Sequence, residues 1–393
     1  MRLLFSRMKK LFTTQNALAF FLFAVTLTVL LCFAFLPKHE ISEKENRSLQ
    51  MFPKISLGGV ADGTFMREMN DFIEDQFPAR DFFVSLNTTA CLLEGNRDLG
   101  GDYSAAPAEG GVYVGKADHL YEVLPPDRNG VFAKNAAGLA SFARESGLPL
   151  FVLPVPSGAT EQRANLPDPC PGNEQGEEMD ELRRLAGNGI EVVDLSDSLS
   201  LQKTGKDYYF KTDHHWNTFG AYVGYTELCK GMGIAPTPQS AFSFRTSERP
   251  FYGTLYSKAP LFWQQPDRFV LPYRADEANL TQETGGSIHK GLYWDRYLTE
   301  KDQYSTYLGG NPAVTVVRNP AAKKGKILLL KDSYANSMIP YLATDFSEIH
   351  LIDLRYYNQD LYDYIRRNGI RQAAAIYSLS QLSEVPVANR LLR

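Results

Sequence analysis

The order of apolar and amphipathic segments predicts the fold class of most of this chain. From about residue 131, short apolar runs alternate with amphipathic segments. Apolar runs of this length are typical of buried strands, and the amphipathic segments of helices. We expect strands at 148–155, 190–195, 327–331, 349–354 and 373–378, and helices at 131–145, 177–185, 218–232, 334–343 and 360–367. This alternation predicts an α/β fold with a mostly parallel sheet covered on both faces.

Two regions do not follow the alternation. Residues 62–92 have helical spacing that Pro78 interrupts, and two apolar segments at 111–114 and 120–124 flank a polar turn, as in a hairpin. Residues 235–312 are rich in aromatic residues, Gly and Pro. We interpret them as an insertion beside the candidate functional site that is described below. Its aromatic residues either fill a core or present a sugar-stacking surface, for which the candidates are Tyr256, Trp263 and Trp294.

The N-terminal region predicts a membrane anchor. Residues 17–36 carry no charged side chain, and a helix of about twenty residues spans the ~30 Å hydrocarbon core. Four basic residues and no acidic one precede it, which favours a cytoplasmic tail at 1–16. The alternatives are a buried core helix and a cleaved signal peptide, but Phe33-Ala34-Phe35-Leu36-Pro37 is a poor cleavage site. We therefore expect a single-pass protein of the cell membrane with its large C-terminal domain outside the cytoplasm.

This topology defines the expected domains and partners. A stalk and helical lead-in would occupy 37–110, and the α/β domain, with its insertion, 111–393. The net charge of -4 gives no basic surface, so no nucleic-acid partner is expected.

Of the four cysteines, Cys170 and Cys229 are the first choice for a disulfide, although spacing does not establish one. No Cys-x-x-Cys or zinc-type spacing occurs, and we expect no cofactor.

The segment Lys211-Thr212-Asp213-His214-His215-Trp216-Asn217 contains the strongest candidate chemistry. An Asp that orients a His, and a His that accepts a hydroxyl proton, are two members of a nucleophilic triad. Ser333 follows a predicted buried strand and precedes a predicted helix, where it could be the nucleophile or only a helix cap. In an extended loop His215 would project beside Asp213, and His214 would point the other way.

Alternatives to the triad remain open at this point. An Asp-x-His triplet is often only a surface or capping feature. Asp213, His214 and His215 could also bind a metal ion, since neighbouring histidines with an Asp occur in metal sites. A metal-dependent hydrolase and a non-catalytic cell-wall or polysaccharide-binding protein are therefore the alternatives to a serine enzyme.

Several blocks in order along the chain resemble the DHHW protein family, which is named for the segment Asp213-His214-His215-Trp216. The others are Glu45-Asn46-Arg47-Ser48-Leu49, Asp75-Gln76-Phe77-Pro78-Ala79-Arg80-Asp81, Gly253-Thr254-Leu255-Tyr256-Ser257-Lys258, Tyr307-Leu308-Gly309-Gly310-Asn311, Lys331-Asp332-Ser333-Tyr334-Ala335-Asn336-Ser337 and Asp353-Leu354-Arg355-Tyr356-Tyr357. That family is more remotely similar to the alginate O-acetylation proteins of the SGNH-hydrolase superfamily. The resemblance runs from about residue 45 to the end of the chain.

The resemblance implies a three-layer SGNH-hydrolase-like sandwich with Ser333, His215 and Asp213 as the triad. Arg355 and Tyr377 would bind the acyl group or oxyanion, and Trp216 is a further substrate-binding candidate. One departure is that Lys-Asp-Ser-Tyr stands where ordinary SGNH esterases have Gly-Asp-Ser.

We therefore expect a serine-dependent O-acetyltransferase or carbohydrate esterase that acts on a cell-surface polysaccharide through an acyl-serine. A membrane partner would supply the acyl donor. The sequence does not separate transferase from esterase.

Overall fold

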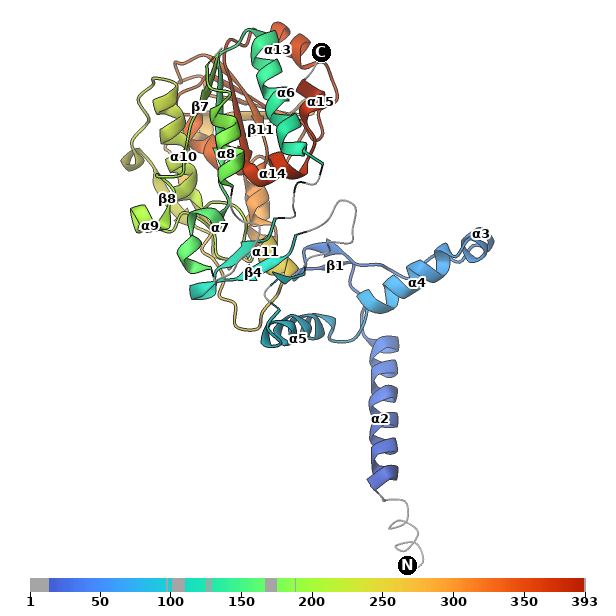
Figure 1. Cartoon of the computed structure of the whole chain (residues 1–393). Helices are drawn as coiled ribbons and strands as arrows, with labels where there is room; N and C mark the ends of the chain where they lie inside the picture. The colour runs from blue at the N-terminus through green and yellow to red at the C-terminus, as the bar shows by residue number, and fades with distance from the viewer. Residues whose placement is uncertain are drawn as a thin grey trace, which may run out of the picture. The chain divides into compact units, whose positions relative to one another are not determined.

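The computed structural model describes residues 14–96, 98–100, 110–124, 127, 129–166, 175–187 and 189–391. It divides into two compact units, Met1–Asn87 and Thr88–Arg393 (Figure 1). Cys170 lies outside the described residues, so its pairing with Cys229 stays a prediction.

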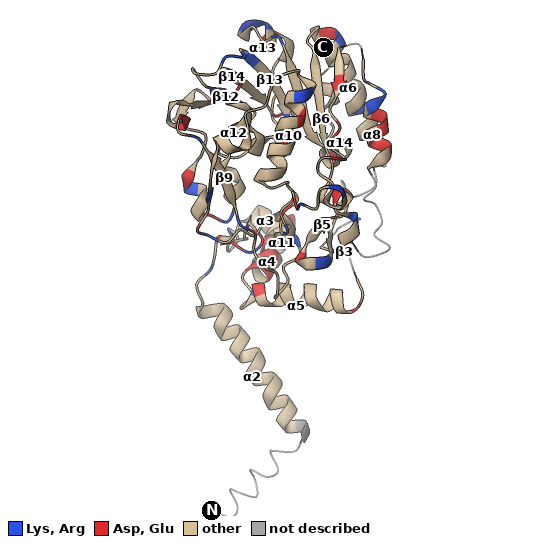
Figure 2. Cartoon of the chain, turned by 90° about the vertical axis from the view of Figure 1, so that its left-hand side faces the viewer, with Lys and Arg blue, Asp and Glu red and all other residues tan. Residues whose placement is uncertain are grey.

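The first unit begins with the long helix α2 (Thr14–Phe35). Within the described residues, it is the one helix long and apolar enough to cross a membrane, and no charged side chain lies along it (Figure 2). A short hairpin follows, formed by β1 (Ile41–Ser42) and β2 (Arg47–Ser48), and then the helices α3 (Leu57–Ala61) and α4 (Thr64–Asp75). The helix α5 (Arg80–Leu93) begins after Pro78, which interrupts the helical spacing as predicted.

The second unit is built on an eight-stranded sheet with the order β11-β10-β12-β14-β13-β15-β6-β7. The strands β14 (Glu348–Ile352), β13 (Lys326–Lys331), β15 (Ala373–Ser378), β6 (Leu150–Val155) and β7 (Ile190–Val192) are parallel. At the other edge, β12 (Val314–Arg318), β10 (Thr281–Thr284) and β11 (Ser287–Lys290) pair antiparallel. The sheet is mostly parallel, which confirms the predicted α/β class.

Two hydrophobic clusters cover the two faces of this sheet. Because successive side chains of a strand point to opposite faces, Leu328 and Leu330 pack on one side and Ile327 and Leu329 on the other. The first side is covered by α6 (Val131–Ser146), α8 (Gly176–Arg183), α13 (Leu361–Asn368), α14 (Leu379–Glu384) and α15 (Ala388–Leu391). The second is covered by α10 (Thr218–Gly231), η7 (Ser333–Met338) and α12 (Ile339–Leu342).

The insertion 235–312 does more than lie beside the sheet. It contributes β10 and β11 to the sheet edge and the separate pair β8 (Ser243–Thr246) and β9 (Val270–Tyr273), with α11 (Thr254–Lys258) between these two strands in the sequence. The predicted hairpin is present as β4 (Val112–Val114) and β5 (Leu120–Glu122), joined by a third strand β3 (Asp98–Leu99). The predicted helix 334–343 is instead the 3₁₀-helix η7 followed by the single turn α12.

Candidate active site

Three side chains from two distant segments form a continuous chain of hydrogen bonds. The His215 Nδ1 lies 2.6 Å from Asp213 Oδ1, and the His215 Nε2 lies 2.7 Å from Ser333 Oγ. Asp213 and His215 lie in the loop before α10, and Ser333 lies directly beyond the carboxyl end of the central strand β13. The structure thus brings together the three residues that the sequence singled out, at distances that permit proton transfer.

The Asp213 carboxylate is fully occupied by donors. Its Oδ1 also accepts the backbone N–H of His215 at 3.0 Å, and its Oδ2 accepts the backbone N–H and hydroxyl of Thr254 at 2.8 and 3.1 Å. Burial alone would raise the pKa of Asp213, but the neighbouring histidines and these hydrogen bonds hold it well below its usual range. Asp213 is therefore an anion that fixes the orientation of the His215 ring.

Sequence reasoning missed the residues that hold the Asp213 loop in place. Asp267 accepts the backbone N–H groups of Lys211 and Thr212 at 2.9 and 2.8 Å and the Thr212 hydroxyl at 2.6 Å. Gly253 lies so close to Asp213 that a Cβ added there would come within 2.2 Å of Asp213 Cβ. The one sequence feature that indicated this contact is the pair Gly253-Thr254, which begins one of the blocks that resemble the DHHW family.

The His215 ring is fixed from its face as well as from its edge. The Tyr304 ring stacks on it with a centroid distance of 3.9 Å and an interplanar angle of 12°. The Tyr304 hydroxyl donates to the backbone carbonyl of Ser333 at 3.0 Å, so one side chain contacts both the base and the nucleophile segment. Burial, together with the charges of His214 and Arg355, lowers the pKa of His215 despite the opposing effect of Asp213. His215 is therefore neutral near pH 7, as a general base must be.

The prediction that His214 points away from His215 is wrong. The two rings lie with their centroids 3.9 Å apart. Residues 211–215 form a series of bends rather than an extended strand, so side chains do not alternate there. The His214 Nδ1 lies 2.6 Å from the Thr254 hydroxyl, which itself donates to Asp213. His214 therefore joins the hydrogen-bond network of the candidate triad through Thr254.

The turn that carries Ser333 is held by the preceding Asp332. Its Oδ1 accepts the Tyr334 backbone N–H at 2.9 Å, and its Oδ2 accepts the backbone N–H and hydroxyl of Ser378 at 2.7 and 2.8 Å. These bonds tie the end of β13 to the end of β15 and leave Ser333 partly exposed. Ser333 thus lies on a rigid strand end rather than on a free loop.

Buried charges lie next to this turn. The Lys331 Nζ is buried and bonds to the side-chain oxygens of Asn311 and Asn336 at 3.0 and 2.8 Å, with Asp353 Oδ2 at 3.9 Å. Asp353 in turn holds Arg355 through two hydrogen bonds of 2.9 and 2.6 Å. Burial lowers the pKa of Lys331 to about 8. The lysine that replaces the usual glycine of the Ser block therefore organises this polar cluster.

Replacing Lys331 by Met should lower the free energy of unfolding by about 3 kcal/mol, because it removes one partner from a buried charge cluster. Between pH 8 and the ordinary lysine pKa of about 10.4, the unfolded chain binds a proton that folded Lys331 does not, so Lys331 adds stability as pH rises. The deficit of Lys331→Met should therefore be larger at pH 10 than at pH 7, measured by denaturant unfolding. The exposed Lys230→Met is the control, and a deficit below about 1 kcal/mol would contradict the prediction.

The substrate-binding candidates differ in their exposure. Trp216 is fully buried, and its indole N–H donates to Tyr334 O and Ser337 Oγ at 3.0 and 2.9 Å, so it supports the Ser333 segment and does not face a substrate. Tyr377 is also buried, because strand alternation directs it into the cluster under α14. Both expectations of substrate contact are therefore wrong.

The remaining candidates keep some exposure. Arg355 is partly exposed and uses three of its five N–H donors on Asp353 and Gln381, which leaves two for a ligand. Tyr256 follows Thr254 in α11 and is partly buried, whereas Trp263 is 43% exposed. Trp294 is partly buried and stacks on His289 at a centroid distance of 4.2 Å.

Asp213, His214 and His215 also satisfy the geometry of a metal site, since one ligand atom of each lies within 4.8 Å of the others. However, both Asp213 oxygens and three of the four ring nitrogens already have hydrogen-bond partners. Within the described residues, His214 Nε2 is the one ring nitrogen of the pair without a partner. Metal binding would have to break the Asp213–His215–Ser333 chain, so the donor set favours a triad.

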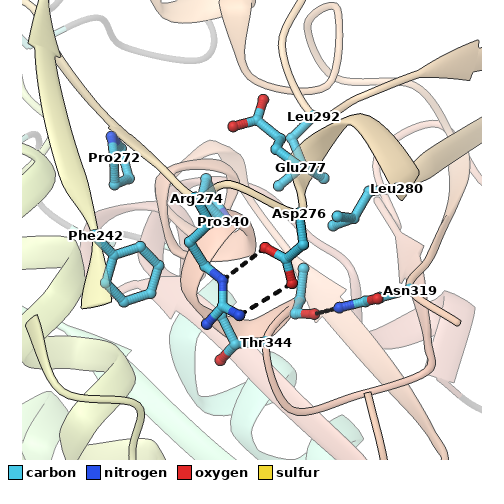
Figure 3. Close-up of a pocket in the computed structure, with 11 residues that line it drawn as sticks. Phe242, Pro272, Arg274, Asp276, Glu277, Leu280, Leu292, Asn319, Pro340 and Thr344 are labelled. Carbon is cyan, nitrogen blue, oxygen red and sulfur yellow. Dashed lines mark hydrogen bonds and ion pairs between the residues drawn. The ribbon is translucent and has the colours of Figure 1, made fainter. Parts of the chain in front are cut away.

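Two of the concave sites in the described part of the second unit are relevant to the chemistry. One cleft reaches Asp213 and His214 and is also lined by Tyr121, Glu122, Tyr209 and Leu255. A second pocket, shown in Figure 3, contains Arg274 and Asp276 near Pro340 and Thr344. Its Arg274 is held by Asp276 in two bonds of 2.9 and 3.0 Å, and its lining has no serine or cysteine nucleophile. The first cleft reaches the candidate site through Asp213 and His214, whereas neither His215 nor Ser333 is among the residues that line it.

The comparisons with known proteins agree with the fold of the second unit. Residues 112–293 match the model described as SGNH hydrolase-like domain, acetyltransferase AlgX. The matched range includes Asp213 and His215, and Ser333 lies beyond it. No curated protein sequence matches the chain significantly.

Solved structures with the same fold are similar over most of their own length. A DHHW family protein from Eubacterium siraeum has a TM-score of 0.60 and 22% identity, covering 70% of this chain and 93% of that one. PatB1 from Bacillus cereus has a TM-score of 0.59 and 23% identity, covering 69% of this chain and 97% of that one. A PatB1 structure with a sulfonyl adduct has a TM-score of 0.58 and 22% identity, covering 70% and 97%. These findings confirm the resemblance that the sequence blocks predicted.

Proposed function

Because the chain carries an SGNH hydrolase-like domain similar to that of acetyltransferase AlgX, we propose that it is an O-acyltransferase or esterase that works through an acyl-serine. The observation that carries this proposal is the hydrogen-bonded chain Asp213–His215–Ser333. A serine hydroxyl becomes an effective nucleophile only when a base takes its proton. His215, neutral and oriented by an ionised Asp213, is such a base.

The proposed reaction has two halves. In the first, Ser333 Oγ attacks the carbonyl carbon of an acyl ester while its proton moves to His215 Nε2. The ester C–O bond then breaks, the departing oxygen takes that proton and leaves as a hydroxyl, and the acyl group stays on Ser333. In the second half, His215 Nε2 takes a proton from the acceptor, whose oxygen attacks the carbonyl carbon of the acyl-serine. The bond between Ser333 Oγ and the acyl group then breaks, and Ser333 Oγ takes the proton back from His215. Water as acceptor gives an esterase, and a sugar hydroxyl gives a transferase. Arg355 is the proposed donor to the negative charge that develops on the carbonyl oxygen.

The substrate class is the less direct part of the proposal. We infer an acetyl group on a cell-surface polysaccharide, with support from the similarity to AlgX and from the partly exposed aromatic residues Tyr256 and Trp263 of the insertion. The apolar helix α2 supports anchoring in the cell membrane, with the basic tail in the cytoplasm and the second unit outside. A membrane protein that supplies the acyl donor is the corresponding proposed partner.

The test is to trap the covalent intermediate. The full-length protein in detergent is incubated with an activated acetyl ester, quenched in acid and digested, and the peptide that contains Ser333 is weighed by mass spectrometry. We expect an added acetyl group on that peptide and none in Ser333→Ala. A sulfonyl reagent should label the same serine. If a folded protein carries neither modification, the result would favour a non-catalytic binding protein. If a chelator abolishes ester turnover, the result would favour a metal-dependent hydrolase.

The pH dependence of ester hydrolysis should reflect the lowered pKa of His215. The base must be neutral, so kcat/KM should fall only when pH drops through the folded pKa, below the ordinary histidine value of about 6.5. The charge of His214 contributes to that lowering, so His214→Ala should move the acidic limb to higher pH. The measurement is a kcat/KM profile of both proteins from pH 4 to 8. An acidic limb at or above about 6.5 in the wild type would contradict the assignment.

A further inference from the structure

The first unit leaves an unusual amount of apolar surface uncovered. Leu57, at the start of α3, is 94% exposed, and Ile55 is 74% exposed. Phe52 and Val60 are also exposed, so exposed apolar side chains recur along the segment that leads into α4. Single exposed apolar residues are normal, but a contiguous group of them marks a surface that another phase or molecule covers.

The helix α4 continues this surface. With 3.6 residues per turn, its apolar side chains form one wide stripe, and Phe72 at one margin of the stripe is buried. Met66 and Ile73, one heptad apart at the other margin, are both exposed. The contacts of the unit therefore use only half of the stripe. We name the uncovered group the apolar rim: Phe52, Ile55, Leu57, Val60, Met66 and Ile73.

Ring contacts place one member of the apolar rim, Phe52, near the outer end of α2. The Phe72 ring packs on Phe33 of α2 with a centroid distance of 5.6 Å, and on Phe52 of the rim with a distance of 5.4 Å. Phe33 lies three residues before Leu36, the last residue of the apolar run, which at 1.5 Å per residue is roughly 4.5 Å. A side chain that touches Phe33 therefore lies at the depth where hydrocarbon meets headgroups.

We propose that the apolar rim is a lipid-binding surface around α2. It would lie in the interface between lipid and water on the extracytoplasmic side of the membrane. This proposal rests on the proposed anchoring of α2. Helices that lie in this interface bury an apolar face by roughly 5–10 Å and keep their polar face in water. The rim fits such a position, because its member Phe52 packs on Phe72, which contacts the anchor, and because the opposite face of α4 is polar.

The charges of the unit are distributed as this position requires. Arg67, Asp71 and Glu74 lie on the exposed opposite side of α4, where water would solvate them. Lys38, directly after the anchor, contacts the Phe33 ring at 3.9 Å, and Lys54 is exposed between Phe52 and Ile55. Basic side chains next to an apolar surface favour contact with anionic headgroups. Lys38 and Lys54 thus lie next to the apolar surface, whereas Arg67, Asp71 and Glu74 lie on the other side of α4.

Depth-dependent quenching tests the proposal on the full-length protein in nanodiscs of zwitterionic and anionic phospholipids. The native cysteines are replaced by Ala, and an environment-sensitive fluorophore is attached in turn at Leu57→Cys, Met66→Cys or Ile73→Cys. Arg67→Cys and Asp71→Cys, on the polar side of α4, are the matched controls, and Leu27→Cys reports on the anchor. Brominated lipids quench only a fluorophore that contacts acyl chains.

We expect quenching at the three rim positions and at Leu27→Cys, and little at Arg67→Cys and Asp71→Cys. Quenching at Leu27→Cys without any at the rim would overturn the rim proposal and leave the anchor standing. No quenching at Leu27→Cys would remove the anchor and the rim together. A rim fluorophore that is blue-shifted yet not quenched would show that protein, either a partner or a second copy, covers the surface instead of lipid.

Discussion

Ser333→Ala and His215→Ala should each lower the rate of ester turnover by at least about 10³-fold, because members of a triad act as a unit. The structure supplies the reason: the His215 Nε2 lies 2.7 Å from Ser333 Oγ, with no second base at the serine within the described residues. Without Ser333 no covalent intermediate forms, and without His215 the hydroxyl keeps its proton. Turnover is followed as product release from an activated acetyl ester, with folding checked by thermal melting.

The double variant distinguishes a triad from two independent contributions. Ser333→Ala combined with His215→Ala should be about as inactive as either single variant, since the second change removes a group that no longer has a function. Ser380→Ala is the control, because its buried hydroxyl has no hydrogen-bond partner. Additive losses, or an active Ser333→Ala, would exclude an acyl-serine mechanism.

The sequence predicted the parts of the fold that depend on local pattern. The parallel strands that flank Ser333 are continuous apolar runs, and the helices between them have clear stop signals, such as Gly147 and Gly369 in left-handed conformation. The antiparallel edge formed by β10 and β11 was not predicted, because those strands are short, polar and embedded in aromatic sequence. Their strand character depends on pairing with β12 rather than on their own pattern.

The same distinction applies to the candidate site. Asp213 and His215 could be selected from their spacing, and Ser333 from its place at the end of a predicted strand. The position of His214 could not, because alternation holds only in an extended segment and residues 211–215 bend. Tyr304 and Asp267 could not be predicted either, since they reach the site through space from the insertion. Trp216 and Tyr377 are not substrate-binding residues in the structure because both are buried. The sequence pattern alone does not show which side chains are buried.

Gly253→Ala should lower kcat/KM by about 10²-fold although Gly253 takes no part in the chemistry. The glycine is not required by its backbone, whose φ of -84° any residue can adopt. It is required by space, because a Cβ would come within 2.2 Å of Asp213 Cβ and 2.3 Å of Asp213 Oδ2. The carboxylate would have to move away from its bonds to Thr254 and His215. A displacement of about 1 Å in such a group is enough for a loss of this size.

The comparison with stability separates this geometric effect from simple unfolding. Overpacking should also cost about 1–3 kcal/mol, seen as a lower denaturant midpoint, but activity should stay reduced under conditions where the variant is fully folded. Gly176→Ala is the matched control, since nothing lies within 4 Å of the added Cβ and its backbone is not left-handed. That variant should keep full activity. If kcat/KM of Gly253→Ala is within twofold of the wild-type value, Asp213 can shift without loss of activity. That result would contradict the orienting role that we assign to the Asp213 carboxylate.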